Sequence, residues 1–222
     1  MPAIPTWALT RPKSLLQHIW DFIGIPARMV LLPDLLAERL HLTSIRAERM
    51  AVVLPVLRGR LLDVGAGDNV LVHLYRETGR AGSEQSVGID TVDWGSDCQI
   101  VPDTARLPLP DRSFDTVSFI ASINHIPERR QALAEAHRVL KDDGCLLVTM
   151  ISRLVGDVGH AIWWYSEEKH REVAPGEVMG LDRAQVLQLL REGGFGAVVE
   201  KRFFYRMNTL YLARKFSQPE SC

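Results

Sequence analysis

The turn in LLDVGAGDNVL (residues 61–71) is the first place where residue types and spacing can do chemistry. A strand that runs into a helix presents backbone N–H groups and the positive end of the helix dipole to a ligand. Gly65 and Gly67 remove the side chains that would hold the ligand away from this backbone. A dinucleotide-binding turn needs a third glycine, but Asp-Asn-Val follows here. The carboxylates of Asp63 and Asp68 would repel a pyrophosphate, so the turn suits a ligand with an ammonium group.

Two further stretches strengthen this interpretation of the turn. Asp90 ends the strand-like run SVGID (86–90), at the position where an acid accepts hydrogen bonds from a ribose diol. The string DTARLPLPDRSFDTVSF follows at 103–119. Taken alone, Asp63 can simply cap the following turn and Asp90 can be an ordinary loop acid. Their combination favours a nucleoside ligand.

With these motifs the chain resembles the class I S-adenosylmethionine-dependent methyltransferases. The most similar branch is the small-molecule type that includes ubiquinone and menaquinone biosynthesis C-methyltransferases. The string D-x-A-x-L-P-x-P-D-x-S-F-D, which begins at Asp103, is the most specific element, and RVLKDDGCLLVTM (138–150) resembles the family's post-helix segment. The resemblance covers about residues 59–150, with the C-terminal helix and hairpin in outline. Asn69 and Asp143 each stand where the family has a glycine.

The resemblance implies S-adenosylmethionine as the cofactor and gives eight residues a role in binding it. Carried over by position, these are Asp63, Gly65 and Gly67 for the methionine moiety, Asp90 for the ribose hydroxyls, Thr91, Asp103 and Thr104 for the adenine, and Ala121 beneath the sulfonium. Asp115 belongs to the motif, but we expect it to be structural, tying the start of its strand.

Methyl transfer requires alignment of the acceptor and sometimes removal of a proton. His125 follows the fourth expected strand, where this branch often has histidine, and Asn124 precedes it. An imidazole titrates near neutral pH and suits a general base. The alternative is a histidine that only bonds a neighbouring loop.

The irregular stretch 152–180 contains many aromatic, histidine and glutamate residues, so we expect an ordered lid over the acceptor pocket. Its substrate or lid residues are expected to be His160, Trp164, Tyr165 and His170, together with Asn124. The aromatics can contact the acceptor or pin the lid to the N-terminal helices, and we slightly favour pinning. A metal held by His125, His160, His170 and a glutamate is the alternative; the spacing matches no known motif, and no metal is expected.

The elements that position these residues change character near residue 59. Before it, short helices are expected over 14–32, broken by Gly24 and Pro26, then from 33–34 to about 42, and over 45–57, the last one capped by Thr43 or Ser44. After it, strands and helices alternate. A third strand is expected over 98–103, Gly144 is expected to close the helix that precedes the fifth strand, and 196–204 and 208–214 can pair as a hairpin. The pattern predicts an α/β, Rossmann-like doubly wound sheet of about seven strands, mostly parallel with an antiparallel C-terminal hairpin strand. We therefore divide the chain into an N-terminal helical cap (1–58) and a Rossmann-like domain (59–222), the lid being inserted at 152–180.

The composition narrows the class of protein. The 222 residues carry a formal net charge of −1, which favours no nucleic-acid partner. Three widely spaced cysteines indicate a reducing compartment. The sequence shows no secretory signal and no apolar stretch of the ~20 residues that a membrane span needs. We expect a cytoplasmic protein without an integral membrane segment; its oligomeric state is open.

The sequence thus predicts an S-adenosylmethionine-dependent methyltransferase that acts on an oxygen or carbon atom of a small organic acceptor. The N-terminal helices are expected to form the other wall of the acceptor pocket, with a membrane-surface role as the alternative. Competing functions are a macromolecule methyltransferase, a catalytically inactive cofactor-binding or partner-activating protein, and a nicotinamide oxidoreductase. The absence of a third glycine and the 103–115 string disfavour the last.

Overall fold

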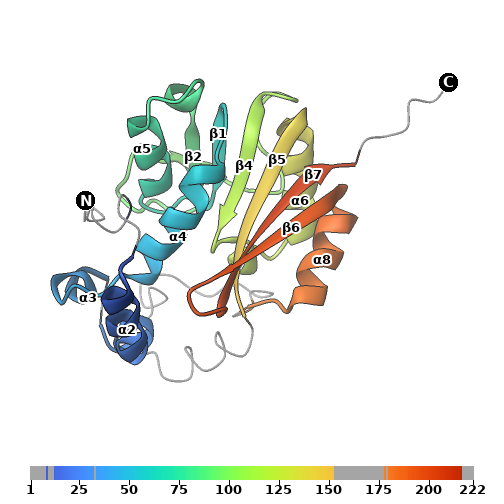
Figure 1. Ribbon diagram of the computed structural model, residues 1–222. Helices are drawn as coiled ribbons and strands as arrows, with labels where there is room; N and C mark the ends of the chain where they lie inside the picture. The colour runs from blue at the N-terminus through green and yellow to red at the C-terminus, as the bar shows by residue number, and fades with distance from the viewer. Residues whose placement is uncertain (1–8, 10–12, 33, 153–177, 179, 217–222) are drawn as a thin grey trace.

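A seven-stranded sheet in the order β3-β2-β1-β4-β5-β7-β6 forms the centre of the molecule (Figure 1). The computed structural model describes residues 9, 13–32, 34–152, 178 and 180–216. The strands are β1 (Leu61–Val64), β2 (Val87–Asp90), β3 (Gln99–Ile100), β4 (Phe114–Ile120), β5 (Leu140–Ile151), β6 (Phe195–Phe203) and β7 (Asn208–Lys215). The first five pair in parallel, and β7 is antiparallel to both β5 and β6. The expected doubly wound sheet with one antiparallel hairpin strand is confirmed.

Helices cover both faces of this sheet (Figure 1). They are α2 (Leu15–Ile23), α3 (Asp34–Arg39), α4 (Ile45–Val53), α5 (Val70–Glu77), α6 (Arg129–Val139) and α8 (Arg183–Glu192). A π turn (η1, Ala27–Leu31) follows α2, and short 3-10 turns are η2 (Leu54–Val56), η3 (Ser83–Gln85) and η4 (Ile123–His125). No helix in the described ranges is long and apolar enough to cross a membrane.

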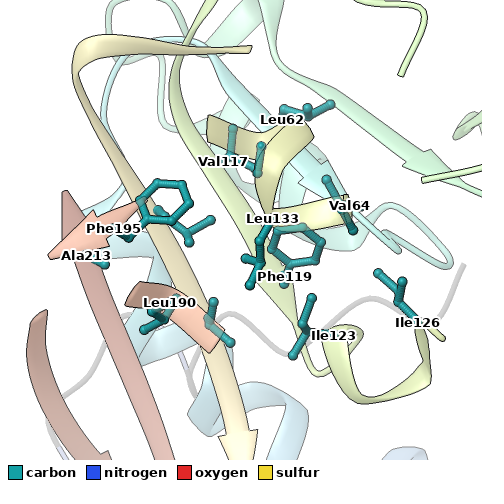
Figure 2. Close-up of a cluster of buried hydrophobic side chains, with 14 of the residues drawn as sticks. Leu62, Val64, Val117, Phe119, Ile123, Ile126, Leu133, Leu190, Phe195 and Ala213 are labelled. Atoms are coloured by element: carbon teal, nitrogen blue, oxygen red, sulfur yellow. The ribbon is translucent and has the colours of Figure 1, made fainter. Parts of the chain in front are cut away.

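Each face of the sheet has its own apolar core. On one face, Leu133 of α6 and Leu190 of α8 pack with Phe119 of β4 and Phe195 of β6 (Figure 2). On the other face, α4 and α5 pack with β1 and the β6–β7 turn, and Met50 and Tyr75 are among the buried residues. β4 is apolar and buried along most of its length because both faces of an interior parallel strand are covered.

Two expected boundaries differ in the structure. The helix before the fifth strand was expected to close at Gly144, but α6 ends at Val139 and β5 begins at Leu140. A Cβ on Gly144 would lie 2.9 Å from the backbone oxygen of Lys141, so the glycine is needed inside the strand, where the β4–β5 register shifts. The third strand, expected over 98–103, contains only Gln99 and Ile100. Pro102 cannot donate a ladder hydrogen bond, which limits its extension.

The N-terminal helices begin and end close to where the sequence predicts. Gly24 ends α2 as its C-cap, and the π turn begins directly after Pro26. Ser44 caps α4 by accepting a hydrogen bond from the backbone N–H of Ala47 at 3.0 Å. In Figure 1, α2 and α3 form a corner of the molecule below α4.

Candidate functional site

Asp63 is the most deeply buried acid at the carboxyl ends of the strands. It pairs in register with Gly88 on β2 and Ser118 on β4. The Ser118 hydroxyl donates a hydrogen bond to Oδ1 of Asp63 at 2.6 Å, the one hydrogen bond that the Asp63 side chain receives within the described part of the chain. Burial, followed by the neighbouring charges of Asp90 and Asp68, raises the pKa of Asp63 to about 7 although the Ser118 bond lowers it. A cation at this carboxylate would favour its ionised form.

The glycine turn after β1 is held by β2. The backbone N–H groups of Gly65 and Ala66 donate to the Ile89 carbonyl at 2.9 and 3.0 Å. Both glycines have positive φ, +73° at Gly65 and +57° at Gly67. A Cβ on Gly65 would lie 2.5 Å from Cβ of Ser122, whereas a Cβ on Gly67 would meet nothing within 4 Å. Gly65 is therefore required by the protein's own packing, and Gly67 leaves open space where a ligand can approach the backbone.

Asn69 keeps the glycine-like geometry of the turn. It is the N-cap of α5 and has φ +61°, a left-handed conformation that asparagine tolerates better than most residues. Its side-chain amide donates to Oδ1 of Asp97 at 2.9 Å. The replacement of the family's third glycine therefore leaves a left-handed turn in place.

Asp68 plays a different part from the one that the sequence suggests. Arg46 of α4 donates hydrogen bonds to both carboxylate oxygens of Asp68. The N-terminal helices therefore neutralise this acid at the turn. Of the two carboxylates expected to attract an ammonium group, Asp63 is the one without a cationic partner in the described ranges.

Asp90 lies at the end of β2 beside the turn, as predicted. Its Oδ2 accepts from the backbone N–H of Gly67 at 2.9 Å, and its Oδ1 accepts from the N–H of Val92 at 3.0 Å. Each carboxylate oxygen has a second lone pair, so the group can still accept from two ligand hydroxyls. Asp90 is thus oriented by backbone contacts before any ligand binds.

The residues expected around the adenine follow β2 and β3. Thr91 is exposed directly after Asp90, and Thr104 is buried. The exposed Asp103 accepts from the N–H of Ala105 at 2.7 Å. The backbone of Val101 donates to the Asp90 carbonyl at 2.9 Å, which holds the chain after β3 against the end of β2.

The end of β4 is tied to both neighbouring strands. Ala121 has φ +55°, and its N–H donates to Oγ1 of Thr149 on β5 at 2.9 Å. The next residue, Ser122, donates from its hydroxyl to the Val64 carbonyl on β1 at 2.6 Å. These two bonds fix the bend that Ala121 makes above the sheet edge.

Asn124 and His125 lie in η4, directly after this bend. The Asn124 amide nitrogen is 3.0 Å from Nε2 of His125. Asn124 also exchanges two hydrogen bonds with Val178. The backbone carbonyl of Asn124 accepts from the Val178 N–H at 3.1 Å, and the side-chain amide of Asn124 donates to the Val178 carbonyl at 3.3 Å. The backbone N–H of Ser152 donates to the Met207 carbonyl at 2.9 Å, so both described ends of the predicted lid are attached near this edge of the sheet.

Other predicted residues cannot be placed at the site. His160, Trp164, Tyr165 and His170 lie outside the described residues. Within the described ranges, no three His, Cys, Asp or Glu side chains gather in a way that could hold a metal ion. Asp115 accepts from the N–H of Arg60 at 2.8 Å and from Lys141 at 2.8 Å, so its structural role at the strand start agrees with the prediction.

Three buried hydroxyls that hold the site were not predicted from the sequence: Ser118, Ser122 and Thr149. The sequence did contain a signal for Ser118, because a buried parallel strand is normally almost continuously apolar and this serine interrupts one. A serine within such a strand needs a hydrogen-bond partner. Asp63, on the neighbouring strand, was a candidate for it.

The sequence is similar to those of known methyltransferases. A family model described as a methyltransferase domain matches residues 62–148. The chain is 31% identical over 160 residues to the ubiquinone/menaquinone biosynthesis C-methyltransferase UbiE of Bordetella avium, covering 65% of this chain and 61% of the relative. It is 30% identical over 165 residues to the 27-O-demethylrifamycin SV methyltransferase of Amycolatopsis mediterranei, covering 68% and 60%.

The fold also matches solved structures. One is a SAM-dependent methyltransferase from Thermotoga maritima, named as a possible histamine N-methyltransferase, with a TM-score of 0.58 and 19% identity. The match covers 89% of this chain and 99% of that one. The chain spans about three fifths of the two curated relatives, so the sequence likeness concerns that part of each.

Proposed function

The chain belongs to the class I S-adenosylmethionine-dependent methyltransferases, and from this premise we propose that it transfers a methyl group to an oxygen or carbon atom of a small organic acceptor. Membership of this family implies S-adenosylmethionine as the cofactor. The observation that carries the proposal is the convergence of Asp63, the open backbone at Gly67 and the oriented Asp90 at one edge of the sheet.

These residues fit the three parts of the cofactor. The carboxylate of Asp63 offers its second oxygen to the ammonium group of the methionine moiety. Gly67 leaves room for that moiety over the turn. The remaining lone pairs of Asp90 accept hydrogen bonds from the ribose hydroxyls. Thr91, Asp103 and Thr104 are assigned to the adenine side.

S-adenosylmethionine, when bound, supplies an electrophilic methyl group on a sulfonium. The protein aligns the acceptor with that methyl group. Ala121, at the bend after β4, is assigned to the surface beneath the sulfonium. His125 is assigned as the base that takes a proton from the acceptor, and Asn124 holds its ring in place.

The acceptor class is inferred from chemistry and from the names of relatives. A histidine base suits a phenolic or enolic oxygen, or an activated carbon. One relative is named a C-methyltransferase and another a methyltransferase of an O-demethylated compound. The formal net charge of −1 gives no support to a nucleic-acid acceptor.

Calorimetry tests cofactor binding. We expect S-adenosylmethionine and its demethylated product to bind and NAD not to bind. Asp90→Ala should weaken binding by about 1.5–3 kcal/mol, or roughly 10- to 150-fold in Kd, because the ribose loses a charged acceptor. Asp93→Ala is the matched control, since Asp93 accepts from Gly95 in the exposed loop nearby. Binding of NAD instead of S-adenosylmethionine would reject the cofactor assignment.

Turnover tests the base. His125→Ala should leave cofactor affinity unchanged and slow methyl transfer to a panel of phenolic and enolic acceptors by about 10²- to 10⁴-fold. Unchanged turnover would place the base elsewhere. Tight cofactor binding with no transfer to any acceptor would favour an inactive or partner-activating protein.

A further inference from the structure

Helix α2 has its apolar and polar sides reversed relative to an ordinary surface helix. Its one acid, Asp21, is fully buried, accepting from the N–H of Thr43 at 2.8 Å and from Lys13 at 2.7 Å. Six large apolar side chains point outward instead, between 48% and 78% exposed: Leu15, Leu16, Ile19, Trp20, Phe22 and Ile23. At 100° per residue they span an arc of about 160°. Among the described residues, the helix therefore presents a continuous apolar side that no other element covers.

The neighbouring segments extend this surface. Leu31 of η1 and Leu36 and Leu40, in and just after α3, are between 43% and 66% exposed. The Trp20 indole donates to the Leu40 carbonyl at 3.0 Å, which holds the two helices together. The α2–α3 face is defined here as these nine residues, and Figure 1 shows both helices at one corner of the molecule.

The area of the α2–α3 face exceeds what a monomer normally exposes. If each side chain contributes on the order of 100 Å², the face totals about 900 Å². The largest apolar patch on a typical monomer is about 300–600 Å². A standard protein–protein interface buries about 800 Å² on each partner. The face is therefore large enough for one side of a stable dimer.

The charges around the face favour a protein partner over an anionic membrane. A membrane-surface helix usually carries unpaired basic residues on its polar side. Here Lys13 and Arg28 both pair with Glu48, and Lys13 also pairs with Asp21. Helix α3 begins with the acid Asp34 and ends with Arg39, so the rim carries both signs. A rim of mixed charge is typical of a protein interface rather than of a surface for anionic lipid.

We propose that the α2–α3 face is an interface between two copies of this chain. The two aromatic side chains of α2 are its anchors. Trp20 is fixed by its bond to Leu40, and Phe22 packs edge-on against Tyr205 with ring centroids 5.4 Å apart. Anchors already held in place lose little freedom on association. The inference is independent of the methyl acceptor.

Sedimentation of the full chain from roughly 0.1 to 100 μM tests the dimer. We expect a species of twice the 25.0 kDa chain mass. The double variant L16E/I23E should raise the dissociation constant at least ~100-fold, because two charges would enter the apolar centre. Val199→Glu is the matched control, since Val199 is equally apolar and 63% exposed, but lies on β6 outside the face. A wild-type circular dichroism spectrum and a cooperative thermal transition confirm that each variant folds, while loss of the dimer itself lowers the midpoint.

A second measurement covers the case in which the double variant does not fold. In a Cys222→Ser background, Ile19→Cys should cross-link two copies with a short bis-maleimide, and Val199→Cys should not. A wild-type protein that stays monomeric at every concentration overturns the proposal, as does a dimer that persists in L16E/I23E or dissociates equally in Val199→Glu. Binding of the monomer to phosphatidylcholine vesicles through the same residues also overturns it and assigns the face to lipid.

Discussion

The carboxyl group of Asp63 lies fully buried between β2 and β4, where its ionisation carries a cost to the fold. The unfolded chain ionises this group as the pH rises past 3.8, whereas the folded chain retains the proton until about 7. The contribution of Asp63 to folding stability is therefore full below pH 3.8 and is lost as the pH rises through 7.

Asp63→Asn should accordingly stabilise the protein at alkaline pH. Asparagine cannot ionise and can still accept the Ser118 hydrogen bond. We expect a gain in the free energy of unfolding of up to about 4 kcal/mol near ~pH 8, and little change near ~pH 4. Urea unfolding at the two pH values measures the difference. An equal effect at both would show that ionisation of Asp63 is not the cause.

Ser118 should set the pH at which the cofactor binds. In the proposed function the ammonium group binds ionised Asp63, so S-adenosylmethionine affinity should rise with pH and level off above about 7. Ser118→Ala removes the hydrogen bond that lowers the pKa of Asp63, and the affinity profile should move to higher pH. Ser122→Ala is the matched control, because its hydroxyl bonds the Val64 carbonyl. Parallel shifts in both variants would argue against a specific role for Ser118.

The sequence located the acids of the site but not the groups that orient them. Asp63 and Asp90 end strands next to a glycine turn, a pattern that periodicity and motif spacing reveal. Ser118 and Arg46 act through partners on other elements, 55 and 22 residues away in sequence. Such contacts depend on strand register and helix placement, which spacing along the chain does not fix.

At the scale of elements, the turn between β1 and α5 carries an asparagine, Asn69, where the family has a glycine, and the sequence alone did not show which backbone conformation would result. Asn69 adopts a left-handed conformation. Asparagine can replace glycine here because it tolerates that conformation better than most residues. The β3 and β5 boundaries were less predictable. Each depends on pairing with a neighbouring strand, and Gly144 is a common helix-ending residue that here lies inside β5.

Substitutions at Asn69 test this explanation of the turn. Asn69→Gly should change the free energy of unfolding by less than about 1 kcal/mol, since glycine adopts positive φ freely and only the Asp97 bond is lost. Asn69→Val should cost about 1–3 kcal/mol and weaken cofactor binding, because a β-branched residue is strained there. Chemical denaturation compares the two. Equal costs would show that the side-chain bonds, not the backbone conformation, matter.

At the scale of the whole molecule, a buried ionic cluster joins the N-terminal helices. It consists of Lys13, Asp21, Arg28 and Glu48, and the Arg28 guanidinium also lies 4.8 Å from the Phe204 ring centre in the β6–β7 turn. The predicted separation of a helical cap (1–58) from the Rossmann-like domain stays a prediction. The described contacts show that at least α2, α4 and the hairpin turn are packed together.

Asp21→Ala should be strongly destabilising because it leaves the Thr43 N–H unpaired and leaves Lys13 and Arg28 sharing the single acid Glu48 in the cluster. We expect a loss of about 3–5 kcal/mol near neutral pH, measured by urea unfolding. Asp142→Ala is the matched control; Asp142 is a surface acid 3.4 Å from Arg112, and such exposed pairs contribute about 0–1 kcal/mol. A cost similar to that of the control would mean that the cluster does not stabilise the N-terminal helices.

The pH dependence of this loss separates charge from packing. Burial alone would raise the pKa of Asp21, but hydrogen bonds from Lys13 and Thr43 and the charge of Arg28 outweigh it and lower the pKa below 3.8. The stabilisation is therefore present above pH 3.8 and is lost as the pH falls through the lower, folded-state value. The difference between wild type and Asp21→Ala should shrink over that window. A difference that stays constant with pH would assign the effect to the cavity, because packing does not titrate.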